Sequence, residues 1–106
     1  MSSTEVTNDE ENTRFEIQVD GEPVGYADYR QAPRNLRAFM KTEVNEAYRG
    51  QGLGGKLIQA ALDSTRDSGL GVLPFCPAFQ SYIAQHPEYV DLVPESRRSE
   101  FELDAS

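Results

Sequence analysis

Apolar and polar residues alternate along the first half of the chain, which is the pattern of half-buried β-strands. Phe15, Ile17 and Val19 alternate with polar neighbours, Asp20-Gly21 is a strong hairpin signal, and residues 24–30 are expected to form the return strand. A third strand is predicted over residues 36–44. One face of it carries Leu36, Ala38, Met40, Thr42 and Val44. The other face carries Arg37, Phe39, Lys41 and Glu43.

In the second half the apolar period changes to that of a helix. A helix is predicted from about Gly52 to Asp67, because apolar residues recur there at helical spacing: Leu53, Leu57, Ile58, Ala61 and Leu62. Residues 71–75 are short and apolar, as in a buried strand. A second helix is predicted from Pro77 to His86, where Pro87 ends it. Three strands, a helix and a strand predict an α/β (α+β) fold with a mixed, mostly antiparallel sheet flanked by helices.

The two ends of the chain are predicted to lie outside this domain. Residues 1–13 are polar and acidic, and we expect them to form a disordered tail. Residues 94–106 are expected to be a polar C-terminal tail. The remaining residues, 14–93, then form one domain, as a chain of 106 residues allows.

Charge and composition exclude several classes of protein. The chain has 18 acidic and 10 basic residues and a net charge of −8, which argues against nucleic-acid binding. The acidity is explained equally by solubility or by a salt-rich cytoplasm. Cys76 is the single cysteine and His86 the single histidine, so neither a disulfide nor the usual zinc site is expected. No signal peptide or membrane span is recognisable, and a cytoplasmic protein is expected.

The stretch from Tyr48 to Lys56 contains four glycines at the start of the predicted helix. Glycines let backbone N–H groups approach a ligand, and the first helical turn favours an anion, most often phosphate. A dinucleotide fingerprint would have to follow a strand directly, but residues 45–48 intervene. A P-loop would need Ser or Thr where Leu57 stands. Arg49-x-x-Gly52-x-Gly54 at a strand-to-helix junction fits best, and it is similar to the pyrophosphate loop of the GNAT superfamily of acyl-CoA-dependent N-acetyltransferases.

The resemblance extends to one GNAT branch of small, single-domain proteins and covers about residues 14–93. The motifs that carry it, in order, are Thr42-Glu43-Val44, Tyr48-Arg49-Gly50-Gln51-Gly52-Leu53-Gly54, Cys76-Pro77, Tyr82-Ile83 and His86-Pro87-Glu88-Tyr89. Members of that branch usually carry a His before the Thr-Glu-Val stretch, where this chain has Lys41. The resemblance implies a GNAT-like fold, acetyl-CoA as co-substrate and an amine as acceptor, either a small molecule or a protein lysine.

It also implies which residues hold the cofactor and which act on it. The cofactor-binding residues would be Val44, Arg49, Gly50, Gln51, Gly52, Leu53, Gly54, Gly55 and Lys56. The catalytic candidates are Cys76, Glu43 and Lys41. Cys76 would begin a helix, which favours a thiolate, and it would act as an acyl carrier or as a proton donor. The alternatives are a buried, inert cysteine, and a Glu43 that merely pairs with Lys41 or Arg37.

Two functions therefore remain in view. The first is an acetyl-CoA-dependent N-acetyltransferase that acetylates a primary amine. The second is a CoA-binding module with little or no turnover, which Lys41 in place of the usual His makes more plausible. The sequence does not identify the acceptor amine or the oligomeric state.

Overall fold

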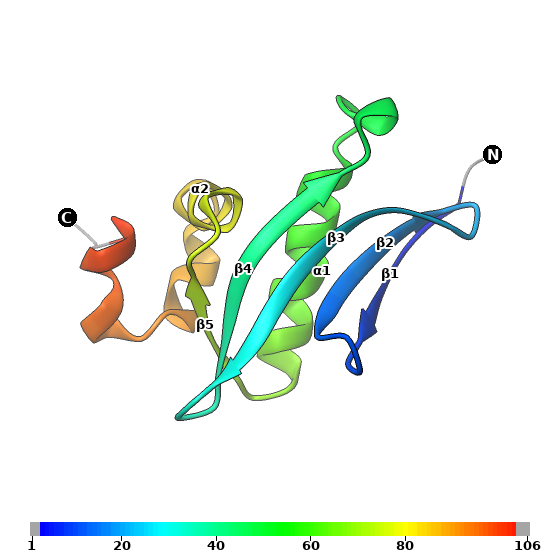
Figure 1. Ribbon diagram of the computed structural model, residues 1–106. Helices are drawn as coiled ribbons and strands as arrows, with labels where there is room; N and C mark the ends of the chain where they lie inside the picture. The colour runs from blue at the N-terminus through cyan, green and yellow to red at the C-terminus, as the bar shows by residue number, and fades with distance from the viewer. Residues whose placement is uncertain (1–2, 104–106) are drawn as a thin grey trace.

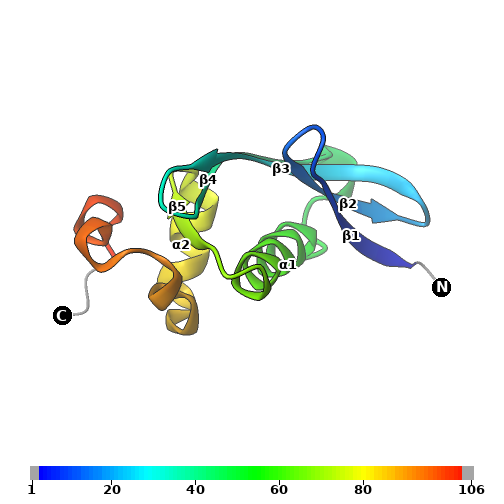
Figure 2. The same cartoon turned by 90° about the horizontal axis from the view of Figure 1, so that it is seen from below.

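The computed structural model describes residues 3–103 and contains one five-stranded sheet (Figure 1). Its strands are β1 (Thr4–Asp9), β2 (Arg14–Val19), β3 (Glu22–Ala32), β4 (Leu36–Val44) and β5 (Gly71–Pro74). Its α-helices are α1 (Leu53–Asp67) and α2 (Pro77–Gln85), and its 3-10 helices are η1 (Glu46–Tyr48), η2 (Pro87–Leu92), η3 (Glu95–Arg97) and η4 (Ser99–Phe101). The strands lie in chain order, antiparallel except for β5, which runs parallel to β4. The predicted mixed, mostly antiparallel sheet is confirmed, and Figure 2 shows α1 and α2 on the same side of it.

The expectation that residues 1–13 are a disordered tail is wrong for most of that segment. Thr4–Asp9 form β1 and pair antiparallel with β2 from Thr4↔Val19 to Asp9↔Arg14. Val6 packs against the core opposite Ile17, so one apolar side chain and a full backbone ladder order a strand that composition alone does not reveal. Residues 1–2 lie outside the described residues.

The segment after residue 93 also differs from the expected polar tail. It forms the short helices η3 and η4, and it buries Phe101 and Leu103. The ring of Phe101 meets the ring of Phe75 edge-on, with centroids 5.3 Å apart. Burial of two apolar side chains against an apolar neighbour is enough to order a segment that is otherwise polar. Residues 104–106 lie outside the described residues.

A β-bulge in β4 changes which faces its side chains occupy. Tyr29 pairs with Phe39 and Asp28 with Lys41, so Met40 is the extra residue between the two pairs. Before the bulge Arg37 and Phe39 are buried on the helix side, whereas beyond it Thr42 lies on that side. Met40 is 44% exposed. The predicted alternation, with Arg37 and Phe39 on the same face as Glu43, is therefore wrong, because an inserted residue reverses the pleat.

Burial of Arg37 is the main consequence on the N-terminal side of the bulge. Its guanidinium lies over the rings of Tyr29 and Phe15, at 4.6 and 5.4 Å from their centroids, and donates to Thr65 Oγ1 at 3.0 Å. Aromatic faces attract a cation, and this attraction partly offsets the cost of removing the charge from water. Arg37 is thus a core residue and not a partner for Glu43.

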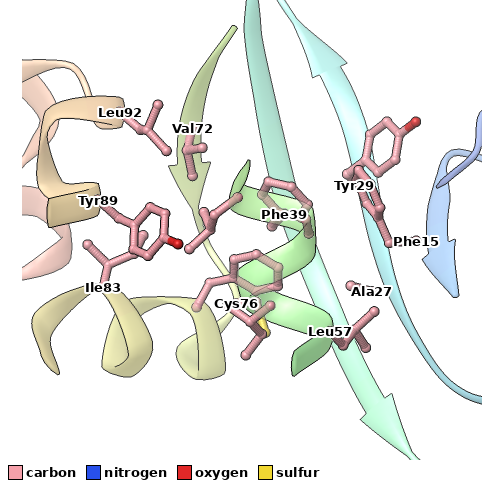
Figure 3. Close-up of a cluster of buried hydrophobic side chains, with 14 of the residues drawn as sticks. Phe15, Ala27, Tyr29, Phe39, Leu57, Val72, Cys76, Ile83, Tyr89 and Leu92 are labelled. Atoms are coloured by element: carbon pink, nitrogen blue, oxygen red, sulfur yellow. The ribbon is translucent and has the colours of Figure 1, made fainter. Parts of the chain in front are cut away.

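The core lies between the sheet and the two helices (Figure 3). Aromatic rings cross it from β2 to α2, through Phe15, Tyr29, Phe39 and Phe79. The predicted apolar stripe of α1 supplies its other wall, with Leu57, Ala61 and Leu62 fully buried. This packing fixes where α1 and α2 begin, and those two helix starts flank the candidate site.

Candidate active site

The chain leaves β4 through a short turn that leads directly into the glycine-rich loop. Asn45 accepts a hydrogen bond from the N–H of Ala47 at 2.9 Å and so caps η1. Gly50 and Gly52 then adopt φ values of +82° and +73°. Only glycine takes these values without strain, and a Cβ at either position would meet nothing within 4 Å. The loop is therefore held open, and its glycines face free space.

The N-terminus of α1 presents unbonded donors at this loop. Lys56 N donates to Gly52 O at 3.2 Å, whereas the N–H groups from Gly50 to Gly55 have no acceptor among residues 3–103. The first turn of any helix leaves such donors, and they carry partial positive charge. Arg49 is exposed beside them and forms no ion pair within the described part of the chain. The open N–H groups, the N-terminus of α1 and the guanidinium of Arg49 together give this loop the chemistry of an anion site.

The loop residues named from the sequence contribute in different ways. Gln51 and Lys56 are exposed, so their side chains are accessible to a ligand. The side chain of Leu53 is buried, so only its backbone N–H faces the loop. Gly54 and Gly55 have ordinary packing distances, since their Cβ atoms would lie 3.9 Å from Val44 and 3.8 Å from Tyr82. The end of β4, the loop and the side of α2 therefore meet at the start of α1.

β4 and β5 separate just beyond the bulge. Their parallel pairing runs from Leu36↔Gly71 to Phe39↔Pro74, and the last link is the bond from Cys76 N to Phe39 O, 2.9 Å long. Beyond it β4 continues to Val44 while the chain turns into α2, and Figure 1 shows the two paths diverging. The C-terminal half of β4 thus has a free edge, where unpaired backbone groups can bind an extended ligand.

Cys76 lies where the two strands part. It is the N-cap residue of α2, its side chain is 4% exposed, and Figure 3 shows it among the core side chains. Its thiol donates to Thr42 Oγ1 at 3.3 Å. Thr42 belongs to the Thr-Glu-Val motif, but the sequence assigned it no role, because its contact with Cys76 depends on the bulge.

Glu43 and Lys41 lie on the opposite face of β4 from Cys76. Lys41 Nζ is 3.3 Å from Glu43 Oε1, and the Tyr26 hydroxyl donates to Glu43 Oε2 at 3.0 Å. The Tyr26 hydrogen bond, followed by that of Lys41, lowers the pKa of Glu43. The hydrogen bond and charge of Glu43 raise the pKa of Lys41. Both side chains are therefore charged at neutral pH. The carboxylate of Glu43 is a weaker base than an unpaired one, and Lys41 stays protonated, so it has no free electron pair with which to accept a proton.

This opposite face also carries an open hollow of about 800 Å³. It extends from Arg49 and Glu46, past Thr42 and Glu43, to residues of β2 and β3. Its complete lining is Arg14, Glu16, Pro23, Val24, Gly25, Tyr26, Thr42, Glu43, Val44, Asn45, Glu46 and Arg49. Sequence reasoning did not find it, because its lining comes from three strands and a loop.

A sequence model of the GCN5-related N-acetyl-transferase family matches residues 14–92, which is most of the chain. The chain belongs to this family. A comparison with curated proteins found no match. Among solved structures, a GCN5-like protein from Staphylococcus aureus has 24% sequence identity and a TM-score of 0.67. That match covers 89% of this chain and 91% of the other.

Two larger relatives share the fold over part of their length. The ribosomal-protein-S18-alanine N-acetyltransferase of Escherichia coli has 20% identity and a TM-score of 0.51, over 56% of this chain and 38% of that one. A GNAT-family N-acetyltransferase of Escherichia coli in complex with CoA has 22% identity and a TM-score of 0.52, over 72% and 43%. The chain spans less than half the length of each of these two proteins.

Two further findings concern other kinds of site. No group of three or more His, Cys, Asp or Glu side chains within residues 3–103 is arranged to hold a metal ion. In the same residues, no helix combines the length and the apolar character that a membrane crossing requires.

Proposed function

We propose that this GNAT protein transfers the acetyl group of acetyl-CoA to a primary amine. The observation that carries the proposal is the arrangement at one end of the sheet. Open N–H groups at the start of α1 lie beside the free edge of β4, and a cysteine lies where β4 and β5 part. An anion site, a free strand edge and a thiol in this order match a ligand with a pyrophosphate, an extended arm and a thioester.

Each part of such a ligand would have a group of this chain to bind it. The N–H groups from Gln51 to Gly55 and the side chain of Arg49 would hold the pyrophosphate, since guanidinium and helix N-terminus both favour phosphate oxygens. Gly50 and Gly52 leave the space that a phosphate needs. The arm would run along β4 between Val44 and Thr42, towards Cys76.

The acceptor amine must lose a proton before it can attack the thioester, which supplies the activated acetyl group. Glu43 is the candidate that would take this proton, directly or through water. Cys76 would act on the other side of β4 in one of two roles, as the group that carries the acetyl or as the group that protonates the leaving sulfur. The hydroxyl of Thr42 would keep its thiol in place.

The second candidate is a CoA-binding module with little or no turnover. The observation that favours it is the ion pair between Lys41 and Glu43, which keeps Lys41 protonated and lowers the pKa of Glu43, so that Glu43 is a weaker base. In that case the loop would bind CoA as proposed, but no amine would be acetylated.

Gly54→Ala tests the cofactor site without disturbing the fold. The new Cβ would lie 3.9 Å from Val44, an ordinary contact, but it would intrude where phosphate oxygens approach the N–H groups. We expect acetyl-CoA affinity, measured by calorimetry, to fall about ten-fold or more, a loss of roughly 1.4 kcal/mol. Ser64→Ala, further along α1, is the control. If the alanine at position 54 left the affinity unchanged while acetyl-CoA bound the parent protein, the pyrophosphate assignment would be wrong.

Cys76→Ala separates the enzyme from the binding module. We expect the variant to keep its acetyl-CoA affinity and to lose most acetyl transfer, measured as release of the CoA thiol. Mass spectrometry of the parent protein after mixing with acetyl-CoA then distinguishes the two roles of Cys76, because only an acyl carrier gains an acetyl group. Transfer at the parent rate by the alanine variant would remove Cys76 from the mechanism.

A further inference from the structure

One row of side chains crosses the face of the sheet opposite the helices. Glu16 of β2 pairs with Tyr26 of β3, and Tyr26 pairs with Glu43 of β4. Residues in register on neighbouring strands place their side chains next to one another on the same face. The two carboxylates therefore flank a phenol ring and lie two strand spacings apart, about 10 Å. All three residues line the hollow.

The hollow is connected to the proposed reaction centre at two points. Thr42 lines it and also accepts the hydrogen bond of Cys76 across the strand. Arg49, of the proposed pyrophosphate site, forms its rim near Glu46. A molecule in the hollow would therefore lie against the segment of β4 along which the acyl group is proposed to run, and on the side away from α1.

Cationic side chains of the protein itself already contact this row of residues. The guanidinium of Arg14 lies 4.1 Å from the centre of the Tyr26 ring and forms an ion pair with Asp28 at 3.1 Å. Glu43 has Lys41 as its partner. Glu16 accepts a hydrogen bond from Gln18 but has no cationic partner among residues 3–103. Three carboxylates thus line the hollow: Glu43 near the proposed reaction centre, Glu46 at the rim with Arg49, and Glu16, without a counter-charge among residues 3–103, at the far side.

We propose that this hollow binds the acceptor, and that the acceptor is a primary amine with a second positively charged group. This inference rests on the proposed acetyl transfer. The reacting amine lies by Glu43 and Thr42, and the distal ammonium is held by Glu16 beside the Tyr26 ring. A charged hydrogen bond to a carboxylate, with an aromatic face next to it, is the usual protein site for an ammonium group.

The reaction balances with these groups alone. The ammonium of the acceptor gives one proton to Glu43 or to water, and its nitrogen then forms the bond to the acetyl carbon. The carbon–sulfur bond of the thioester breaks, the nitrogen loses its second proton, and the sulfur of CoA takes up that proton, so the products are the amide, free CoA and the one proton released at the start. The distal ammonium remains charged throughout, so Glu16 holds substrate and product equally.

Two amines of equal chain length test the inference. Hexane-1,6-diamine carries the second charge and hexylamine does not. We expect the diamine to have a KM at least about ten-fold lower, as one charged hydrogen bond allows. Calorimetry on the CoA-loaded protein should show diamine binding, because the diamine would lie in the hollow and CoA along the free edge of β4, so that the two ligands meet only at the reacting amine and thioester. Equal KM values, or displacement of the diamine by CoA, would overturn the inference and leave acetyl transfer itself intact.

Glu16→Gln locates the second charge. It removes the charge of this carboxylate and leaves Glu43, Thr42 and Cys76 in place, so we expect the KM advantage of the diamine over hexylamine to disappear. Glu88→Gln makes the same change of net charge on exposed η2 and should keep the advantage. An advantage that survives Glu16→Gln would place the distal ammonium elsewhere and contradict the proposal. Absence of acetyl-CoA binding in the parent protein would instead refute the proposed function.

Discussion

At the scale of single residues, the bulge at Met40 determines what the motif around it can do. If β4 alternated regularly through Met40, with no bulge, Phe39 and Glu43 would lie on one face of the strand and Thr42 on the other. With it, Phe39 and Thr42 share the helix side, and Thr42 meets the thiol of Cys76. One inserted residue thus places a hydroxyl against Cys76 and turns Glu43 towards the hollow.

Thr42→Val tests whether that hydroxyl matters. Valine keeps the branched shape but removes the acceptor of the Cys76 hydrogen bond. We expect kcat for acetyl transfer to fall about ten-fold while the KM for acetyl-CoA changes less than about two-fold, because only the thiol loses its partner. Thr42→Ser retains a hydroxyl and should recover most of the rate. Equal kcat values for the two variants would show that the hydroxyl has no part in the reaction.

At the scale of elements, η2 docks onto α1 through polar contacts around a buried ring. The hydroxyl of Tyr89 donates to Asp63 at 2.8 Å, and Arg66 forms a bidentate pair with Asp91. Burial, followed by the hydrogen bond and charge of Asp63, raises the pKa of Tyr89 from 10.0 to about 12. The neutral phenol is therefore favoured in the folded protein.

This contact predicts a loss of stability in alkali. Because the folded pKa of Tyr89 is raised, its contribution is complete below pH 10 and disappears as the pH rises towards 12. The contribution is at most about 3 kcal/mol. Urea unfolding at pH 9 and pH 11.5 should show a smaller loss of unfolding free energy in Tyr89→Phe than in the parent protein. Tyr48→Phe, which removes a phenol far from η2, is the control. Equal losses in the parent and Tyr89→Phe would contradict the assignment.

At the scale of the whole molecule, the net charge of −8 acts against compactness. Every side chain in the four ion pairs among the described residues is at least one-third exposed, so these pairs contribute little to stability. Self-repulsion of the acidic surface is therefore the larger electrostatic effect, and salt screens it.

We expect the melting temperature to rise between low and molar KCl. An increase of about 5 °C corresponds to roughly 1 kcal/mol in a domain of this size. Thermal unfolding followed by circular dichroism measures it, with sucrose of matched osmolality as a control for exclusion effects. A flat or falling melting temperature would leave solubility as the reason for the acidity.

Elements with local signals can be predicted from the sequence. The apolar residues of α1 recur with the helical period, and Asp20-Gly21 indicates the hairpin. The glycines from Gly50 to Gly55 indicate a loop whose positive φ values favour glycine. Each of these features depends on residues that are close to one another in the sequence. The glycine-rich loop, the hairpin and the helix α1 are therefore predictable from the sequence.

Other features depend on contacts between residues that are far apart in the sequence, and only the folded structure reveals them. β1 forms because its backbone pairs with that of β2. The C-terminal segment is ordered because the ring of Phe101 packs against the ring of Phe75. The face of every β4 residue past Met40 depends on pairing with β3, and a bulge has no signature in the alternation of a single strand. Cys76 meets Thr42, and Glu16 lines up with Glu43, only because strands remote in sequence are adjacent in the sheet. Such contacts result from the packing of whole elements, and the residue pattern of a single strand does not specify them.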